Sequence, residues 1–114
     1  MPMFKPGTIV LVNFPFTDSQ SSKVRPALVL TKKGDDVIIL GIFSKSIDGL
    51  RESWIKVDGL SPDFHKTGLK KTSIIKTEKI TVIHQSLVRK ELGSLSSELM
   101  RQVRKILRKT LEIE

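Results

Sequence analysis

Short apolar runs separated by polar segments make up most of the chain. Each run is rich in β-branched residues or alternates apolar with polar positions, as strands do. The segment KKGDD between the second and third runs has the composition of a hairpin turn. The predicted strands span residues 8–14, 26–31, 37–43, 52–57, 73–76 and 79–84. Many short strands with turn signals between them predict a compact antiparallel barrel or sandwich.

The pattern changes its period near the C-terminus. From Leu95 to Leu111 the apolar residues recur every three or four positions, which predicts an amphipathic helix. Ser94 or Ser96 can cap this helix, and Glu98 suits its first turn. The opposite face carries five basic residues: Arg101, Arg104, Lys105, Arg108 and Lys109. Such a stripe is typical of the solvated side of a helix that packs on a sheet.

Length and composition indicate one soluble domain, residues 1–114. The chain has no cysteine, which excludes disulfides and thiolate metal sites. The longest apolar run, residues 37–43, is far shorter than the ~20 residues that span a bilayer. The N-terminus has no apolar stretch long enough for a secretory signal. We therefore expect a cytoplasmic protein without a membrane partner.

Basic residues outnumber acidic ones by 20 to 12, which gives a formal net charge of +8. One interpretation is a solvated basic surface that keeps a small protein soluble. The other is attraction to a polyanion, either nucleic acid or an acidic protein segment. Long runs of Lys or Arg are absent, so the charge belongs to a folded surface.

Several kinds of catalytic machinery have no counterpart in the sequence. It contains no P-loop, no dinucleotide-binding fingerprint, and no HExxH or GxSxG motif. The only two histidines, His65 and His84, lie far apart and lack carboxylates at metal-ligand spacing. We therefore expect neither a metal nor a cofactor. Each histidine is better explained as a surface side chain than as an acid or a base.

The stretch KVRPALVL, residues 23–30, places an arginine at the start of an apolar strand. Pro26 has no N–H for a sheet ladder, which predicts an edge or a strand start. The residue before a proline is held extended, so the backbone of Arg25 has few options. From there Arg25 could grip a phosphate with its planar fork. It could also pair with a nearby carboxylate, as surface arginines commonly do.

Three segments resemble the PemK/MazF family of toxin endoribonucleases, and together they cover nearly the whole chain. GTIVLVNFPFTDSQSSKVRPALVL (residues 7–30) is similar to the family's first strand, polar loop and Arg-Pro strand start. FSKSI (residues 43–47) resembles the segment after the third strand, where the family has a Thr or Ser. GLKKTSIIKTEKITVIHQSLVRKELGSLSSELMRQVRKIL (residues 68–107) resembles the C-terminal half, ending in the last helix.

The resemblance implies a mainly β fold: a small antiparallel SH3-like barrel with a C-terminal amphipathic helix. It implies a homodimer that cuts single-stranded RNA without a metal. In the family's chemistry a ribose 2′-OH attacks the adjacent phosphate, leaving a 2′,3′-cyclic phosphate and a free 5′-OH. The resemblance also implies a cognate antitoxin whose acidic, disordered segment occupies the groove and silences the toxin.

The resemblance also implies roles for particular residues. Arg25 matches the family's catalytic arginine, which would stabilise the charge of the phosphorane. Ser44 aligns with the family's Thr or Ser and could hydrogen-bond a non-bridging oxygen. Where some relatives have R-x-D, this chain has Lys76-Thr77-Glu78. Glu78 is then the predicted proton acceptor and Lys76 a phosphate ligand, although a lysine lacks the bidentate fork. The alternative is that both are ordinary turn residues.

Other residues are predicted to bind the RNA rather than to cleave it. Target bases would be read by the loops at the groove, because unpaired bases expose their edges. Phe16 and Trp54 are candidates for stacking on bases, and each could instead lie in the core or a dimer interface. The predicted RNA-binding residues are Thr17, Asp18, Ser19, Ser21, Lys23, Lys45 and Lys76.

Two other functions fit the same barrel. The first is a non-catalytic module that holds RNA or a ribosomal surface, which the substitutions at Lys76 and Glu78 keep open. The second is a toxin that poisons gyrase. Toxins of that kind act through their terminal residues and do not need an Arg-Pro strand start, so KVRPALVL counts against it.

Overall fold

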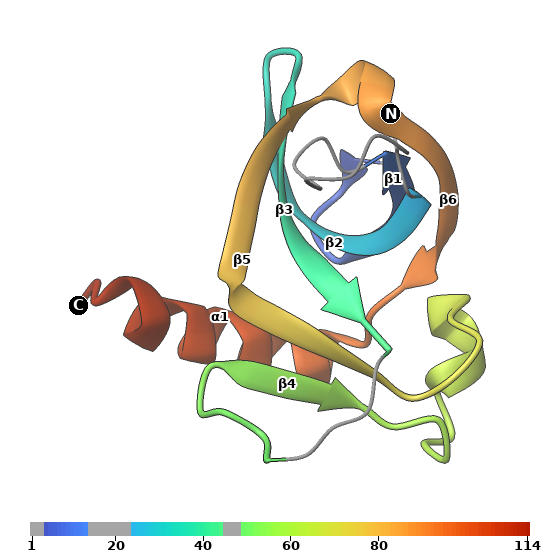
Figure 1. Ribbon diagram of the computed structural model, residues 1–114, viewed down its shortest axis with the longest axis vertical. Coiled ribbons are helices and arrows are strands. Elements are labelled where there is room, and N and C mark those ends of the chain that lie inside the picture. The colour runs from blue at the N-terminus through green and yellow to red at the C-terminus, as the bar shows by residue number, and fades with distance from the viewer. Residues whose placement is uncertain (1–3, 14–23, 45–48) are drawn as a thin grey trace.

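Six strands form one antiparallel sheet in the computed structural model, which describes residues 4–13, 24–44 and 49–114. The strands lie in the order β4-β5-β3-β2-β1-β6. Figure 1 shows the sheet curling so strongly that β1, β2, β3, β6 and one half of β5 surround a common axis. The elements are β1 (Thr8–Asn13), β2 (Val24–Lys33), β3 (Asp36–Phe43), β4 (Trp54–Val57), β5 (Ser73–His84), β6 (Val88–Ser94), α1 (Ser97–Leu111) and the short 3-10 helices η2 (Phe64–Thr67) and η3 (Gln85–Leu87).

This architecture confirms the predicted fold class: a small antiparallel barrel with a C-terminal helix. β4 and β6 are the two ends of the sheet order, so the barrel is open rather than closed. No helix within the described residues is long and apolar enough to cross a lipid bilayer.

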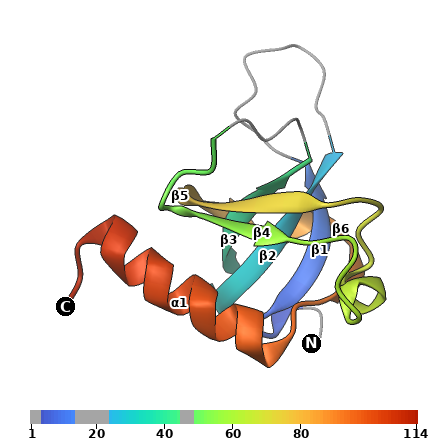
Figure 2. The same cartoon turned by 90° about the horizontal axis from the view of Figure 1, so that it is seen from below.

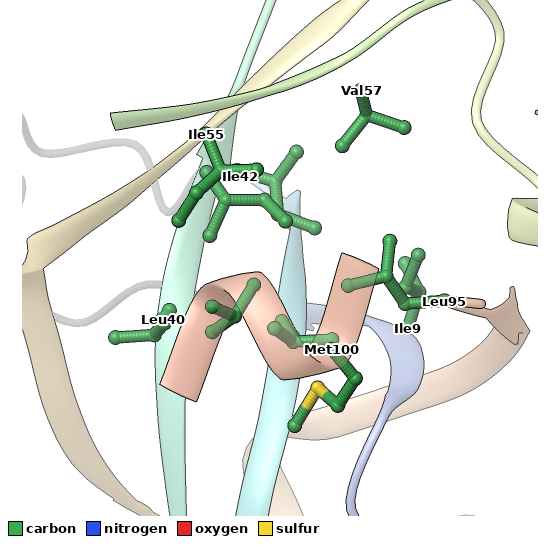
Figure 3. Close-up of a cluster of buried hydrophobic side chains, with 10 residues drawn as sticks. Ile9, Leu40, Ile42, Ile55, Val57, Leu95 and Met100 are labelled. Carbon is green, nitrogen blue, oxygen red and sulfur yellow. The ribbon is translucent and has the colours of Figure 1, made fainter. Parts of the chain in front are cut away.

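Both faces of the sheet are buried over the middle of β1, β2 and β3, which explains the near-continuous apolar runs in these parts of the sequence. One face lines the inside of the barrel with Val10, Val12, Ala27, Val29, Val37, Ile39 and Ile83. The opposite face packs under α1, which lies along this side of the sheet (Figures 2 and 3), and its cluster includes Ile9, Leu28, Leu40, Ile42, Ile55, Ile75, Met100 and Val103. Alternate residues of β1, β2 and β3 therefore serve different cores.

The helix α1 begins directly after Ser96, one of the two predicted caps. Ser96 is the N-cap, and its Oγ accepts a hydrogen bond from the backbone N–H of Leu99 at 3.2 Å. Met100 and Val103 are buried against the sheet, while the five basic residues of the stripe are exposed. The prediction of an amphipathic helix on a sheet is confirmed.

Several strand boundaries differ from the prediction, and β2 runs from Val24 to Lys33 rather than over residues 26–31. The two runs 73–76 and 79–84 form one long strand, β5, and β4 begins at Trp54 rather than at Glu52. Sequence reasoning missed β6, because four of its seven residues are exposed and three of them are charged. Pro26 lies within β2, not at its first residue, yet at this point β2 pairs with β1 alone and pairing with β3 begins at Ala27. The proline thus occupies a local edge.

η2 is held on β6 by direct backbone contact at Gly93. A Cβ on Gly93 would lie 2.2 Å from the carbonyl oxygen of Lys66 and 2.6 Å from that of Thr67. A side chain at this position would push η2 away from the sheet. The close approach therefore requires a glycine.

We expect Gly93→Ala to lower the free energy of unfolding by about 1–3 kcal/mol, because the added methyl overpacks a backbone contact. Urea denaturation would measure the change. The control is Gly34→Asn, at a hairpin turn where φ is 61° and nothing lies within 4 Å of an added Cβ. Asparagine tolerates that conformation, so this variant should stay close to wild type. Equal stability of Gly93→Ala and the wild type would contradict the predicted contact.

Candidate functional site

Arg25 is held by a strand that is buried on both faces. Ala27, Leu28 and Val29 have no exposed surface, and Arg25 lies opposite Val12 of β1. The side chain of Arg25 is partly buried, and within the described residues it forms no salt bridge. The alternative of a surface arginine paired with a carboxylate therefore finds no support in the part of the chain that the structure describes.

Arg25 is the first member of a row of side chains that crosses four neighbouring strands. Its guanidinium carbon lies 5.8 Å from the ring centre of Phe43 on β3. The ammonium of Lys76 on β5 lies 4.5 Å from that same ring and 4.5 Å from the ring of Trp54 on β4. The Arg51 guanidinium lies 5.4 Å from Trp54. All four distances are within the range of a cation–π interaction.

Glu78 fastens the end of this row. Its Oε2 accepts a hydrogen bond from the indole N–H of Trp54 at 2.7 Å, and its Oε1 accepts one from Ser53 Oγ at 2.8 Å. Oε2 also lies 3.6 Å from Arg51 Nη1. Burial raises the pKa of Glu78, but the hydrogen bonds from Trp54 and Ser53 and the charge of Arg51 outweigh it, so the pKa is lowered.

The lowered pKa has two consequences. Glu78 is ionised at neutral pH, and it is a weaker base than an ordinary glutamate. Because the pKa is lower in the folded state than in the unfolded chain, the ionised carboxylate stabilises the fold above the unfolded pKa. That stabilisation is lost as the pH falls through the folded pKa.

A bend in β5 brings Lys76 and Glu78 to this site. Along β3 the partners on β5 jump from Ile80, opposite Leu40, to Lys76, opposite Gly41. The extra residues, 77–79, form an irregularity at which β5 turns sharply in Figure 1. Thr77 in this bend is fully buried. Its hydroxyl donates to the carbonyl of Ser53 at 2.7 Å and lies 2.6 Å from the hydroxyl of Thr110 on α1.

Ser44 lies on the other side of the Arg-Pro strand start. It is exposed, and together with Pro26 it lines a cavity of about 330 Å³. Three lysines, Lys70, Lys71 and Lys90, also line this cavity, and its apolar wall is formed by Leu11, Leu69 and Leu92. Among the described residues the lining includes no carboxylate, so this part of the cavity favours an anion.

The structure describes four of the ten predicted site residues. Arg25 and Lys76 contact the same ring, Glu78 joins them through Trp54, and Ser44 lies in the neighbouring cavity. The other predictions, Thr17, Asp18, Ser19, Ser21, Lys23 and Lys45, lie outside the described residues, as does Phe16. Neither histidine joins the site: both are exposed, and His84 Nδ1 accepts a hydrogen bond from the backbone N–H of Ser86.

Sequence reasoning missed Phe43, Arg51 and Ser53. Phe43 was assigned only to a strand, although its parity with Gly41 places both on one face of β3. Arg51 and Ser53 fall around the predicted start of β4, and their role depends on where Glu78 points. Trp54 was a stacking candidate, but two cations already lie against its ring.

Several solved structures have the same fold as this chain. The toxin MazF-mt6 from Mycobacterium tuberculosis has a similar structure (TM-score 0.72, 17% identity, 94% of this chain and 98% of that chain). An endoribonuclease bound to its cognate antitoxin from a Mycobacterial species also matches (TM-score 0.72, 12% identity, 96% and 95%). So does MazE–MazF from Deinococcus radiodurans (TM-score 0.71, 17% identity, 96% and 96%). At these identities the likeness shows the fold.

No match is found among curated proteins. The model of the family described as PemK-like, MazF-like toxins of type II toxin–antitoxin systems matches residues 5–111. That match spans all six strands and α1. The chain belongs to this family of PemK-like, MazF-like toxins.

Proposed function

We propose that this toxin is an endoribonuclease that cleaves single-stranded RNA without a metal and that Arg25 stabilises the transition state. The observation that carries the proposal is the placement of Arg25, on a strand buried from both sides and without a carboxylate partner in the described residues. A rigidly held donor that is always charged suits a phosphate that gains negative charge as it reacts. Two of the similar structures are named endoribonucleases.

The proposed reaction is a transesterification. The ribose 2′-oxygen attacks the adjacent phosphorus, and its proton passes to a base. The bond from phosphorus to the 5′-oxygen breaks, and that oxygen leaves as a hydroxyl with a proton from water. The products are a 2′,3′-cyclic phosphate and a 5′-OH. Arg25 donates hydrogen bonds to the phosphate oxygens, and Ser44 supplies a further donor.

The general base stays a prediction. Glu78 is ionised, but hydrogen bonds from Trp54 and Ser53 already engage both of its oxygens, and Lys76 and two aromatic rings separate it from Arg25 in the row. These contacts favour a role in holding Trp54. The RNA strand itself would be attracted by the cations of the row and by the lysines of the cavity beside Ser44.

We also propose that an antitoxin with an acidic segment neutralises this toxin. One of the similar structures is an endoribonuclease in complex with its cognate antitoxin, and another is MazE–MazF. The net charge of +8 and the exposed basic stripe on α1 give the toxin a surface that attracts an acidic chain. A homodimer, which the family resemblance implies, stays a prediction.

Purified protein should cut a long unstructured RNA at discrete sites in excess EDTA. Arg25→Ala should lower the cleavage rate by at least about 10²-fold, the loss typical of removing one transition-state donor. Mapping of the product ends should find cyclic phosphate and 5′-OH. Arg101→Ala, which removes the same charge from the exposed face of α1, should cleave normally.

Retention of full activity by Arg25→Ala would refute the proposed mechanism. RNA that binds but stays intact in the wild type would instead assign the protein as a binding module. Thermal unfolding of both variants would show that any loss of cleavage is not a loss of fold.

Glu78→Gln separates the two roles of this residue. The amide oxygen still accepts a hydrogen bond from Trp54, so the position of Trp54 should be kept. We expect the cleavage rate to stay within about tenfold of wild type, whereas loss of a general base would lower it by about 10²–10⁴-fold. Single-turnover rates would measure the effect. A loss of 10²-fold or more, together with unchanged RNA binding, would place the general base at Glu78.

A further inference from the structure

We propose that Phe43 and Trp54 are positioning residues that clamp Lys76 as a second phosphate ligand, next to the phosphate held by Arg25. The inference deepens the proposed function and rests on it. It begins from the ammonium of Lys76, which lies 4.5 Å from each of the two ring centres. One ring comes from β3 and the other from β4, so the clamp closes across β5, the strand between them.

The two rings orient the ammonium group of Lys76. A lysine head group is a point charge on a flexible stem, without the fixed planar fork of an arginine. Two aromatic faces attract the ammonium and restrict its rotamers, so Lys76 is oriented before RNA arrives. This accounts physically for a lysine at the position where some relatives carry an arginine.

Each ring is itself held in place. Phe43 lies against the backbone of Gly41: a Cβ there would lie 2.8 Å and 2.9 Å from two atoms of the ring. A side chain larger than hydrogen at Gly41 would therefore displace Phe43. Trp54 is fixed at its other end, because its indole N–H donates to Glu78 at 2.7 Å.

The clamp also leaves Lys76 available to an anion. Phe43 contacts both Arg25 and Lys76, and within the described residues neither cation forms a salt bridge. Arg51, by contrast, already faces Glu78. Two like charges against one ring repel each other, and a chain of phosphates relieves that repulsion. This pair of cations therefore fits a chain of phosphates, and under the proposed function that chain is RNA.

The test measures binding of a fluorescein-labelled, mixed-sequence single-stranded RNA with 2′-O-methyl groups, which cannot be cleaved. Lys76→Met should weaken binding about tenfold, as expected for loss of a charged contact. It should also flatten the dependence of log Kd on log salt concentration by about 0.7, the value for one phosphate of a single strand. Lys76→Arg should keep the affinity within about twofold, because arginine also stacks on aromatic rings. Lys33→Met removes the same charge from an exposed position at the far end of β2 and should bind like wild type.

A double-mutant cycle distinguishes clamping from general support of the fold. Trp54→Leu and Phe43→Leu should each weaken binding about threefold while Lys76 is present. Trp54→Leu should not weaken binding further in Lys76→Met, because the cation that it positions is already gone. Phe43→Leu should cost less there than in the wild type, because only its contact with Arg25 remains. Additive losses would overturn the proposal, and so would an unchanged affinity in Lys76→Met.

Tryptophan fluorescence gives a second measurement that is independent of affinity. Trp54 is the only tryptophan in the chain, so the emission reports on this site alone. Adding the 2′-O-methyl RNA should change the emission of the wild type and of Lys33→Met, but not that of Lys76→Met. The same change in all three proteins would contradict the clamp.

The outcomes separate this inference from the proposed nuclease. A wild type that binds the probe with the predicted cycle but leaves natural RNA intact would keep the clamp and refute the nuclease. Discrete cleavage of RNA by a Lys76→Met variant that binds normally would keep the nuclease and refute the clamp. A wild type that binds no RNA would refute both.

Discussion

The burial of β2 on both faces is the constraint on which the site depends. Ala27 and Val29 point into the barrel and Leu28 points toward α1, so sliding the strand by one residue would exchange two cores. Pro26 adds a fixed φ angle just before these residues. Arg25 is carried by the one end of this strand that pairs only with β1, and its head group is left facing the row. The proposed stabilisation of a phosphorane requires a charged donor that a strand with a fixed register holds in this way.

The bend in β5 is the second structural determinant, and a buried hydroxyl holds it. Thr77 is bonded to the backbone of Ser53 before β4 and to Thr110 on α1, which ties three elements together at one point. Lys76 and Glu78 flank Thr77, so the same contact sets the direction of both side chains. α1 thus covers the core and also fixes the bend that presents the row. The extra residues of the bend enlarge the local twist, as bulges beside functional sites commonly do.

The hydrophobic pattern predicted most strands, the helix and its cap, because burial leaves a direct periodic trace in the sequence. β6 left no such periodic trace, because its exposed charged residues, Arg89, Lys90 and Glu91, are typical of a loop. Arg25 was found through its motif. The row of side chains around Arg25 could not be predicted, because its contacts depend on the register between β2, β3, β5 and β4. The irregularity after Leu40 sets that alignment, and no local residue preference signals it.

The row also shows how a departure from a family motif can be compatible with the same chemistry. An arginine orients itself through two parallel hydrogen bonds, whereas a lysine has to be oriented by its surroundings. Here the surroundings are two rings, one seated on a glycine and one fastened by a carboxylate. Both oxygens of Glu78 accept hydrogen bonds, from Trp54 and from Ser53, and these bonds lower its pKa. Lys76 and Glu78 both contact Trp54, so replacing either residue changes the surroundings of the other.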